Sequence, residues 1–336
     1  MSEVFSLEGK RIWVAGHAGM VGSAVLRRLE RERVGDIIVA TRADLDLRRQ
    51  ADVEHFVATN RPDAVVLAAA KVGGIQANRS AQGEFLYDNL LIAANTIEAS
   101  RMFGVQRVLV LGSSCIYPRE AAQPIAEDRL MTGPLEPTNE GYAIAKIAAL
   151  EMGKMYRQQY GLDVISLMPT NLYGPYDNFD LENGHVLPAL MRKIHESKVE
   201  GRDSVELWGT GKPRREFLHV DDAADAVIFG LQHIAEATHL NVGYGDDVSI
   251  RELAELLASV IGWTGEFVYQ SDMPDGMLRK LLDVSAMDSL GWRRSINLED
   301  GLISTYRWFV ENLKSLRGVG ALSPSGEASY SSIGNP

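Results

Sequence analysis

Tyr142 and Lys146 stand four residues apart in a stretch whose apolar spacing predicts a helix from about Asn139 to Tyr160, ended by Gly161. A spacing of four places both side chains on one face of that helix. A phenol has a reference pKa of about 10, and a nearby ammonium group favours its ionised form. The pair therefore predicts a tyrosine that exchanges a proton with a substrate oxygen. The alternative is a core tyrosine beside a surface lysine.

Ser113 and Cys115 follow a predicted strand at 107–112. Ligands of open α/β sheets bind at the carboxyl ends of the strands. In an extended segment Ser113 and Cys115 would share one face, with Ser114 on the other. A serine hydroxyl that bonds a substrate carbonyl completes a Ser/Tyr/Lys triad. Cys115 is the single cysteine, so an intrachain disulfide and a cysteine metal cluster are excluded, and a small buried packing residue is the alternative to a catalyst.

A glycine-rich turn, with Gly16, Gly19 and Gly22, separates a predicted strand at 11–15 from a predicted helix at 23–32. Glycines permit a tight turn and the close approach of a diphosphate, which then binds backbone N–H groups at the helix N-terminus. The G-x-x-G-x-x-G spacing is typical of short-chain dehydrogenases and differs from G-x-G-x-x-G. A plain strand-to-helix turn is the alternative.

Arg42 follows the second predicted strand, at 36–40. Enzymes that use NAD commonly have an acid here for the ribose 2′-hydroxyl, whereas arginine suits a 2′-phosphate. Arg42 thus favours NADP(H), with a solvated surface arginine as the alternative. Asp46, a few residues further on, is a candidate for a contact with the edge of the adenine ring. An ordinary turn residue is the alternative.

The elements around these motifs alternate between apolar strands and helices. Further strands are predicted at 64–70 and 163–168, and further helices at 51–60 and 85–103. Continuous apolar strands are typical of a parallel sheet that helices cover on both faces. The predicted fold class is α/β, a doubly wound parallel sheet (Rossmann) with a smaller C-terminal substrate-binding lobe.

Beyond Pro169 the pattern is less regular. A helix is expected near 186–198, and 218–243 are expected to return to the main sheet as a helix and a strand. The expected division is an NADP-binding domain at 1–178 and 218–246, a substrate lobe at 179–217 and 247–317, and a Ser/Gly-rich disordered tail at 318–336.

Composition restricts the function classes. The chain has 336 residues, 46% of them hydrophobic, and a formal net charge of -11, which opposes a general nucleic-acid or membrane-surface role. The N-terminus MSEVFSLEGKR lacks the apolar core of a signal peptide, and no apolar run is long enough to span a bilayer. We expect a cytoplasmic enzyme without a metal site.

Several longer motifs resemble the extended short-chain dehydrogenase/reductase superfamily and, within it, the GDP-L-fucose synthase family. They are AGHAGMVGSAV, AAAKVGGI, LGSSCIYP, LEPTNEGYAIAK, MPTNLYGPYDNF, HVLPAL, REFLHVDD and RKLLDV, and they cover nearly the whole chain except the tail. The combination of SSCIYP, PTNLYGP and HVLPAL is narrower than the superfamily signature.

The resemblance implies NADPH-dependent 3,5-epimerisation and 4-reduction of GDP-4-keto-6-deoxy-D-mannose to GDP-L-fucose. It also implies a homodimer formed through the helices near 85–103 and 139–160. The family's Ser/Tyr/Lys triad falls on Ser113, Tyr142 and Lys146, and its epimerising acid and base fall on Cys115 and His185.

The resemblance also implies a set of binding residues. The cofactor contacts are Gly16, His17, Ala18, Gly19, Met20, Val21, Gly22, Arg42, Asp46, Leu47, Leu111, Gly112, Ser113, Lys146, Pro169, Thr170, Asn171, Leu172 and His185; the substrate contacts are Lys193, Trp208, Arg215 and Asp275. Ala18 departs from the family, because members can have an arginine there beside the 2′-phosphate. Arg42 still favours NADP(H).

Two other function classes fit the same motifs. A related nucleotide-sugar 4-epimerase or 4,6-dehydratase would share fold and triad but retain its cofactor, and a dehydratase is expected to have an acid close to the triad serine, where this chain has Cys115. A cofactor-sensing module without catalysis would have no need of an intact triad.

Overall fold

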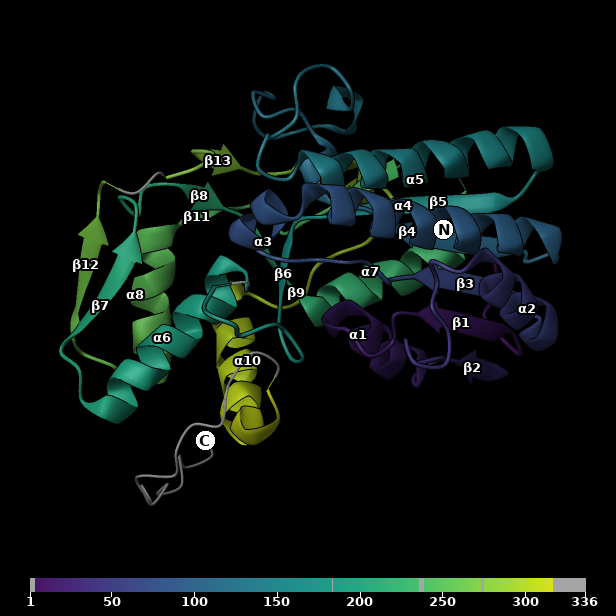
Figure 1. The fold of residues 1–336 in the computed structure, drawn as a ribbon. Helices are drawn as coiled ribbons and strands as arrows, with labels where there is room; N and C mark the ends of the chain where they lie inside the picture. Colours follow the sequence, from purple (N-terminus) through teal and green to yellow (C-terminus); the bar gives the residue numbers. More distant parts are fainter. Residues whose placement is uncertain (1–3, 183, 236–238, 273–274, 317–336) are drawn as a thin grey trace.

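The computed structural model describes residues 4–182, 184–235, 239–272 and 275–316. Its centre is a sheet of six parallel strands in the order β10-β5-β4-β3-β1-β2 (Figure 1). The strands are β1 (Arg11–Ala15), β2 (Asp36–Ile38), β3 (Ala64–Leu67), β4 (Arg107–Leu111), β5 (Asp163–Pro169) and β10 (His239–Val242). The predicted fold class is confirmed.

Helices cover both faces of this sheet, which is why its strands are apolar throughout. Along β1, Ile12 and Val14 pack into a core with α1 (Met20–Leu29) and α7 (Val220–His233). Trp13 and Ala15 point to the opposite core, which is closed by the remaining helices of the domain. Those helices are α2 (Gln50–Asn60), α4 (Gln82–Met102) and α5 (Glu140–Tyr160).

The strand order reverses between β1 and β3, because the chain moves to β2 on one side of β1 and then to β3 on the other. A crevice opens at such a switch point, outside the carboxyl ends of the strands, and binds the ligand in doubly wound sheets. Here the ends of β1 and β3 approach closely: a Cβ on Gly16 would lie 2.6 Å from the Ala69 backbone.

A second group of elements lies beside the sheet, at the left of Figure 1. Its parallel strands β7 (Ser204–Trp208) and β12 (Glu266–Gln270) accompany the helices α6 (Val186–Glu200), α8 (Ile250–Ile261) and α10 (Leu298–Asn312). The helices share an apolar core of their own, formed by side chains that include Leu190, Ile194, Leu253, Leu257 and Leu302.

Short strands connect the two groups. β6 (Asn171–Tyr173) pairs in parallel with β9 (Phe217–His219), and β8 (Arg214–Arg215) lies between β11 (Val248–Ser249) and β13 (Arg279–Lys280). The other elements are α3 (Ile75–Ser80), α9 (Ser285–Ser289) and 3-10 turns at Ser114–Ile116, Glu127–Arg129 and Leu313–Ser315.

Most predicted elements are present with small differences at their ends. The helix expected from residue 23 begins at Met20, so the glycine turn is shorter than predicted. The strands expected to reach residues 40 and 70 end at Ile38 and Leu67. The return of 218–243 to the sheet is confirmed, since β10 pairs with β5. The predicted tail at 318–336 lies outside the described residues. In the described part of the chain, no helix combines the length and the apolar character needed to cross a membrane.

Candidate active site

The glycine turn forms a backbone cradle at the start of α1. Gly16 has φ +90°, and a Cβ on Gly22 would lie 2.1 Å from the Gly16 carbonyl oxygen, so neither position accommodates a side chain without movement. A Cβ on Gly19 would meet only the Gly16 oxygen at 3.4 Å. Gly19 is the N-cap of α1 without a side-chain cap, and the first turn contains no acid. The N–H groups there suit an anionic diphosphate.

The rest of the predicted turn residues surround this cradle. His17 is half-buried and Ala18 is exposed, while Met20 and Val21 begin the helix and pack against the core below it. Arg42 is exposed beyond β2 and borders an open hollow of about 550 Å³, which Arg48 and Lys71 also line. The acids Glu84 and Asp88 line the same hollow and pair with Lys71 and Arg48, so its lining is mixed in charge, and Arg42 borders the expected 2′-phosphate position.

Helix α4 holds the two loops that flank the crevice. Asn95 donates from Nδ2 to the Leu47 carbonyl oxygen at 2.9 Å, which ties the loop after β2 to the helix. Asn89 bonds both backbone groups of Lys71, accepting from its N–H at 2.9 Å and donating to its carbonyl at 3.0 Å. Both loops therefore have set positions before a ligand binds.

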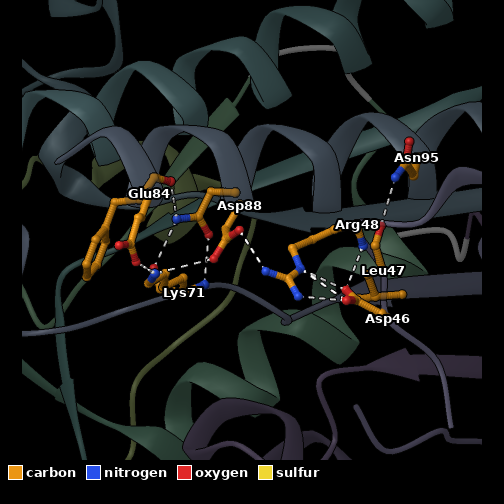
Figure 2. Close-up of polar contacts among 9 residues, drawn as sticks. Asp46, Leu47, Arg48, Lys71, Glu84, Asp88 and Asn95 are labelled. Carbon is orange, nitrogen blue, oxygen red and sulfur yellow. Dashed lines mark hydrogen bonds and ion pairs between the residues drawn. The ribbon is translucent and has the colours of Figure 1, made fainter. Parts of the chain in front are cut away.

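Figure 2 shows a row of alternating charges that reinforces this arrangement. Arg48 donates to both carboxylate oxygens of Asp46 and to Asp88 Oδ1 at 3.1 Å, and Lys71 pairs with Asp88 and Glu84. The Arg48 guanidinium lowers the pKa of Asp46 to about 2, because it hydrogen-bonds the ionised carboxylate. Asp46 is thus a fixed anion rather than a free turn residue.

The triad residues meet at the carboxyl end of β4. Lys146 is buried and donates from Nζ to the Leu111 carbonyl at 2.7 Å, with Nζ 5.7 Å from the centre of the Tyr142 ring. Gly112 continues the pairing by donating to the Leu167 carbonyl at 2.8 Å. Burial lowers the pKa of Lys146 to about 8.

Tyr142 differs from the sequence-based expectation. Burial raises its pKa above the ordinary phenol value, the Cys115 sulfur adds to the rise, and a hydrogen bond with Ser113 opposes it. Desolvation outweighs the ammonium effect that was expected from Lys146, because Lys146 is directed at a backbone carbonyl. In this state Tyr142 is a protonated phenol, suited to donating a proton.

The extended path predicted for Ser113, Ser114 and Cys115 is wrong, although Ser114 is more buried than its two neighbours. β4 ends at Leu111, and Ser114–Ile116 form a 3-10 turn that Ser113 caps by accepting from the Cys115 N–H at 3.2 Å. Ser114 is buried, whereas Cys115 is half-exposed. Ser113 and Cys115 nevertheless lie at one site, because both act on Tyr142.

His185 is the N-cap of α6, on the side of the second group of elements. The residue is exposed to solvent at the start of this helix. Pro169 to Leu172 form the bend from β5 into β6, where the Asn171 amide donates to the Glu216 carbonyl at 2.8 Å. The same carbonyl accepts from the Thr170 hydroxyl at 3.3 Å.

Two of the four predicted substrate contacts, Lys193 and Trp208, lie on α6 and β7 of the second group, Arg215 lies on the connecting strand β8, and Asp275 lies between β12 and β13. Lys193 Nζ lies 5.8 Å from the centre of the Trp208 ring, which is 67% exposed and available for stacking. Arg215 is on β8, and burial lowers the pKa of its guanidinium. Asp275 is already occupied, accepting from the Thr210 N–H at 2.7 Å and hydroxyl at 2.8 Å, so it anchors the turn after β7.

Sequence reasoning did not find several residues that support the site. Asp88, Asn89 and Asn95 are buried polar residues in the apolar face of α4. Polar residues that interrupt an apolar pattern are the sequence feature that could have indicated a supporting role. Asn139 and Lys280 lie close to the Cys115 sulfur. Apart from the family motifs that contain them, nothing in the sequence indicated this position. In the described part of the chain, no group of three or more His, Cys, Asp or Glu side chains is arranged to hold a metal ion.

The glycine cradle, Arg42 and the Ser/Tyr/Lys cluster define a cofactor-dependent enzyme of the short-chain type. A family model described as the NAD dependent epimerase/dehydratase family matches residues 12–243, and the chain belongs to this family.

Within the family, curated relatives identify the particular enzyme that this chain resembles. The GDP-L-fucose synthase of Sinorhizobium fredii is 52% identical over 92% of this chain and 98% of its own length. GDP-L-fucose synthase 1 of Arabidopsis thaliana is 53% identical over 93% of this chain and 97% of its own length, and the Escherichia coli enzyme is 49% identical over 92% and 99%. The resemblance inferred from the motifs is confirmed.

Solved structures agree. A GDP-L-fucose synthetase from Naegleria fowleri bound to NADP superimposes with a TM-score of 0.87 at 27% identity, covering 94% of this chain and 98% of its own. A GDP-6-OMe-4-keto-L-xylo-heptose reductase from C. jejuni gives a TM-score of 0.86 at 35% identity, covering 90% and 98%.

Proposed function

We propose that this chain converts GDP-4-keto-6-deoxy-D-mannose to GDP-L-fucose by 3,5-epimerisation and NADPH-dependent 4-reduction. The relatives that carry the name GDP-L-fucose synthase support the proposal. The observation that carries it is the Cys115 thiol beside Ser113 and Tyr142, because reduction alone needs no such group.

NADP(H) is the cofactor, and the residues present fit it. The Gly16–Gly22 cradle leaves room for a diphosphate at the start of α1, and Arg42 supplies a cation for the 2′-phosphate. Lys146 holds the nicotinamide ribose in this proposal. When bound, NADPH supplies a hydride to C4 of the sugar.

Epimerisation needs two groups on opposite sides of the sugar ring. The C4 carbonyl acidifies the hydrogens on C3 and C5, so inversion removes a proton from one face and returns one to the other. Cys115 and His185 serve this exchange from the two sides of the site. Ser113 and Tyr142 donate hydrogen bonds to O4 and stabilise the enolate between the two steps.

Reduction uses the triad. Tyr142 gives its proton to O4 as the hydride reaches C4, and its raised pKa keeps it protonated until then. The GDP group is held by Lys193, Trp208 and Arg215, since a cation suits the diphosphate and an exposed ring suits the base. Asp275 contributes by fixing the turn after Trp208.

Three further assignments belong to this proposal. Residues 1–178 and 218–246 form the NADP-binding domain, and 179–217 with 247–317 form the substrate lobe. The chain acts as a homodimer through α4 and α5, which expose Tyr87, Leu90, Ile144, Met155 and Tyr160. A cytoplasmic location agrees with a single, free cysteine.

The test is incubation with GDP-4-keto-6-deoxy-mannose and NADPH, followed by NMR of the sugar and of solvent deuterium at C3 and C5. We expect GDP-L-fucose from the parent enzyme. Cys115→Ser should lose exchange while it still reduces part of its substrate, because a hydroxyl is a far weaker acid than a thiol. Reduction without inversion by the parent would instead make the chain a 4-keto reductase. A tightly retained cofactor without net reduction would indicate an epimerase or dehydratase.

A further inference from the structure

Two residues that follow β2 favour different cofactors. Arg42 suits a 2′-phosphate, whereas an acid such as Asp46 is the type of group that bonds the ribose 2′-hydroxyl in enzymes that use NAD. The hydrogen bond from Arg48 lowers the pKa of Asp46 most, and the nearby Arg42 charge lowers it too. Asp46 therefore lies within electrostatic reach of Arg42, and its negative charge would repel a phosphate bound there.

Arg48 occupies the Asp46 carboxylate (Figure 2). Its Nε donates to Oδ1 at 2.9 Å and to Oδ2 at 3.2 Å, and its Nη2 donates to Oδ2 at 2.7 Å. The Arg48 backbone N–H donates to Oδ1 at 3.1 Å as well. Charge-assisted contacts from a planar guanidinium to both carboxylate oxygens are among the strongest hydrogen bonds in proteins. The acid of this loop is therefore neutralised before a cofactor binds.

A second acid holds Arg48 from the other side. Arg48 Nη1 donates at 3.1 Å to Oδ1 of Asp88, which is buried on α4, and Oδ2 of Asp88 lies 3.4 Å from Lys71 Nζ. An isolated ion pair at the surface contributes little, because solvent screens it and its side chains lose entropy. Here the guanidinium is anchored by two carboxylates, one of them buried, so Arg48 keeps its place beside Asp46.

Arg42 has a different environment at the edge of the same hollow. It is exposed, and among the residues that the structure describes it makes no ion pair. The acids that line the hollow, Glu84 and Asp88, are both paired with Lys71. The charge of Arg42 is thus available to an anionic ligand.

We propose that Arg48 determines cofactor specificity by neutralising Asp46, so that the site accepts the 2′-phosphate which Arg42 binds. Asp88 acts through Arg48 and is a positioning residue. This inference rests on the proposed cofactor contacts. Without Arg48, the loop after β2 would present an unpaired acid near the ribose, which is the arrangement typical of enzymes that use NAD.

Cofactor binding to the unliganded enzyme tests this role without turnover. Isothermal titration calorimetry gives the Kd for NAD+ and for NADP+, and the ratio Kd(NAD+)/Kd(NADP+) is the 2′-phosphate preference. Arg48→Met should lower this preference about tenfold, because a single neighbouring charge shifts such equilibria by a factor of ten or more. Arg48→Lys keeps a cation beside Asp46 and should retain most of the preference. Asp88→Ala should lower it by a smaller factor, because Asp46 still holds Arg48.

A second substitution distinguishes neutralisation of Asp46 from a direct contact between Arg48 and the phosphate. Asp46→Asn added to Arg48→Met removes the unpaired charge and should restore the preference to within about threefold of the parent. Asp44→Asn is the matched control for this rescue and should not restore it, because Asp44 accepts from the Thr41 hydroxyl at 2.6 Å. Arg49→Met, which removes an adjacent exposed arginine, should leave the parent preference unchanged.

The outcomes separate this inference from the proposed function. If the parent prefers NADP+, an unchanged preference in Arg48→Met, or a lowered one that Asp46→Asn does not restore, would overturn the inference alone. A parent without any preference would refute the proposed cofactor assignment and the inference with it. A restored preference in an enzyme that forms no GDP-L-fucose would support the inference and refute the proposed reaction. Circular dichroism checks folding, and Arg48→Gln, which lacks the charge, replaces Arg48→Met if that variant does not fold.

Discussion

Two alanine substitutions in the glycine turn separate the packing of the turn from its contact with the cofactor. At position 22 an added Cβ would lie 2.1 Å from the Gly16 carbonyl oxygen and 2.7 Å from the His17 Cα. These are backbone atoms, so the turn itself must move. At position 19 the Cβ would meet only the Gly16 oxygen at 3.4 Å, and φ −85° is ordinary for alanine. The space beside Gly19 is where the diphosphate is expected.

The magnitudes follow from these contacts. Overpacking costs typically about 1–3 kcal/mol, and the better helix propensity of alanine recovers up to about 1 kcal/mol, so Gly22→Ala should lower the free energy of unfolding by about 2 kcal/mol. Gly19→Ala should lower it by less than about 1 kcal/mol, the difference between glycine and alanine at an N-cap. Its methyl group should instead weaken NADPH binding by tenfold or more, since about 1.4 kcal/mol of steric conflict is a factor of ten.

Urea unfolding followed by tryptophan fluorescence measures the first quantity, and a fluorescence titration with NADPH measures the second. We expect Gly22→Ala to lose stability and Gly19→Ala to lose affinity while it stays stable. If Gly19→Ala binds NADPH with the parent Kd, the diphosphate does not lie against Gly19. If Gly22→Ala unfolds at the parent urea concentration, the turn yields more easily than its contacts indicate.

Three further predictions concern the site. Arg42→Ala should raise the KM for NADPH and leave that for NADH unchanged, because only NADPH has the 2′-phosphate; equal efficiency of the parent with both cofactors would refute the assignment. Tyr142→Phe should lower reduction by orders of magnitude in a folded protein, and near-normal turnover would show that the hydroxyl is structural. Because burial lowers the pKa of Lys146 to about 8, its charge is lost as the pH rises through that value. The kcat/KM for NADPH should therefore fall above it, and Lys146→Met should abolish that dependence; an alkaline decline that persists in this variant would belong to another group.

Local sequence patterns determined the parallel sheet and the main chemical groups. Apolar runs such as 64–67 have no polar face, so only a sheet that is covered on both sides can bury them. Gly16 and Gly22 indicated a cradle because only glycine fits so close to the backbone. Tyr142 and Lys146 were recognisable because four residues are nearly one helical turn.

The tertiary structure decided what surrounds those groups. Whether Lys146 faces a carbonyl or the tyrosine determines which pKa shifts dominate, and no spacing along the chain contains that information. The 3-10 turn at Ser114–Ile116 replaced the expected extended path beyond Ser113, because Ser113 caps that turn by accepting from the Cys115 N–H. Lys280 reaches Cys115 across 165 residues, through the short strand β13 that exists only when β8 is beside it. Contacts of this kind depend on pairing between distant segments, which local propensity does not encode.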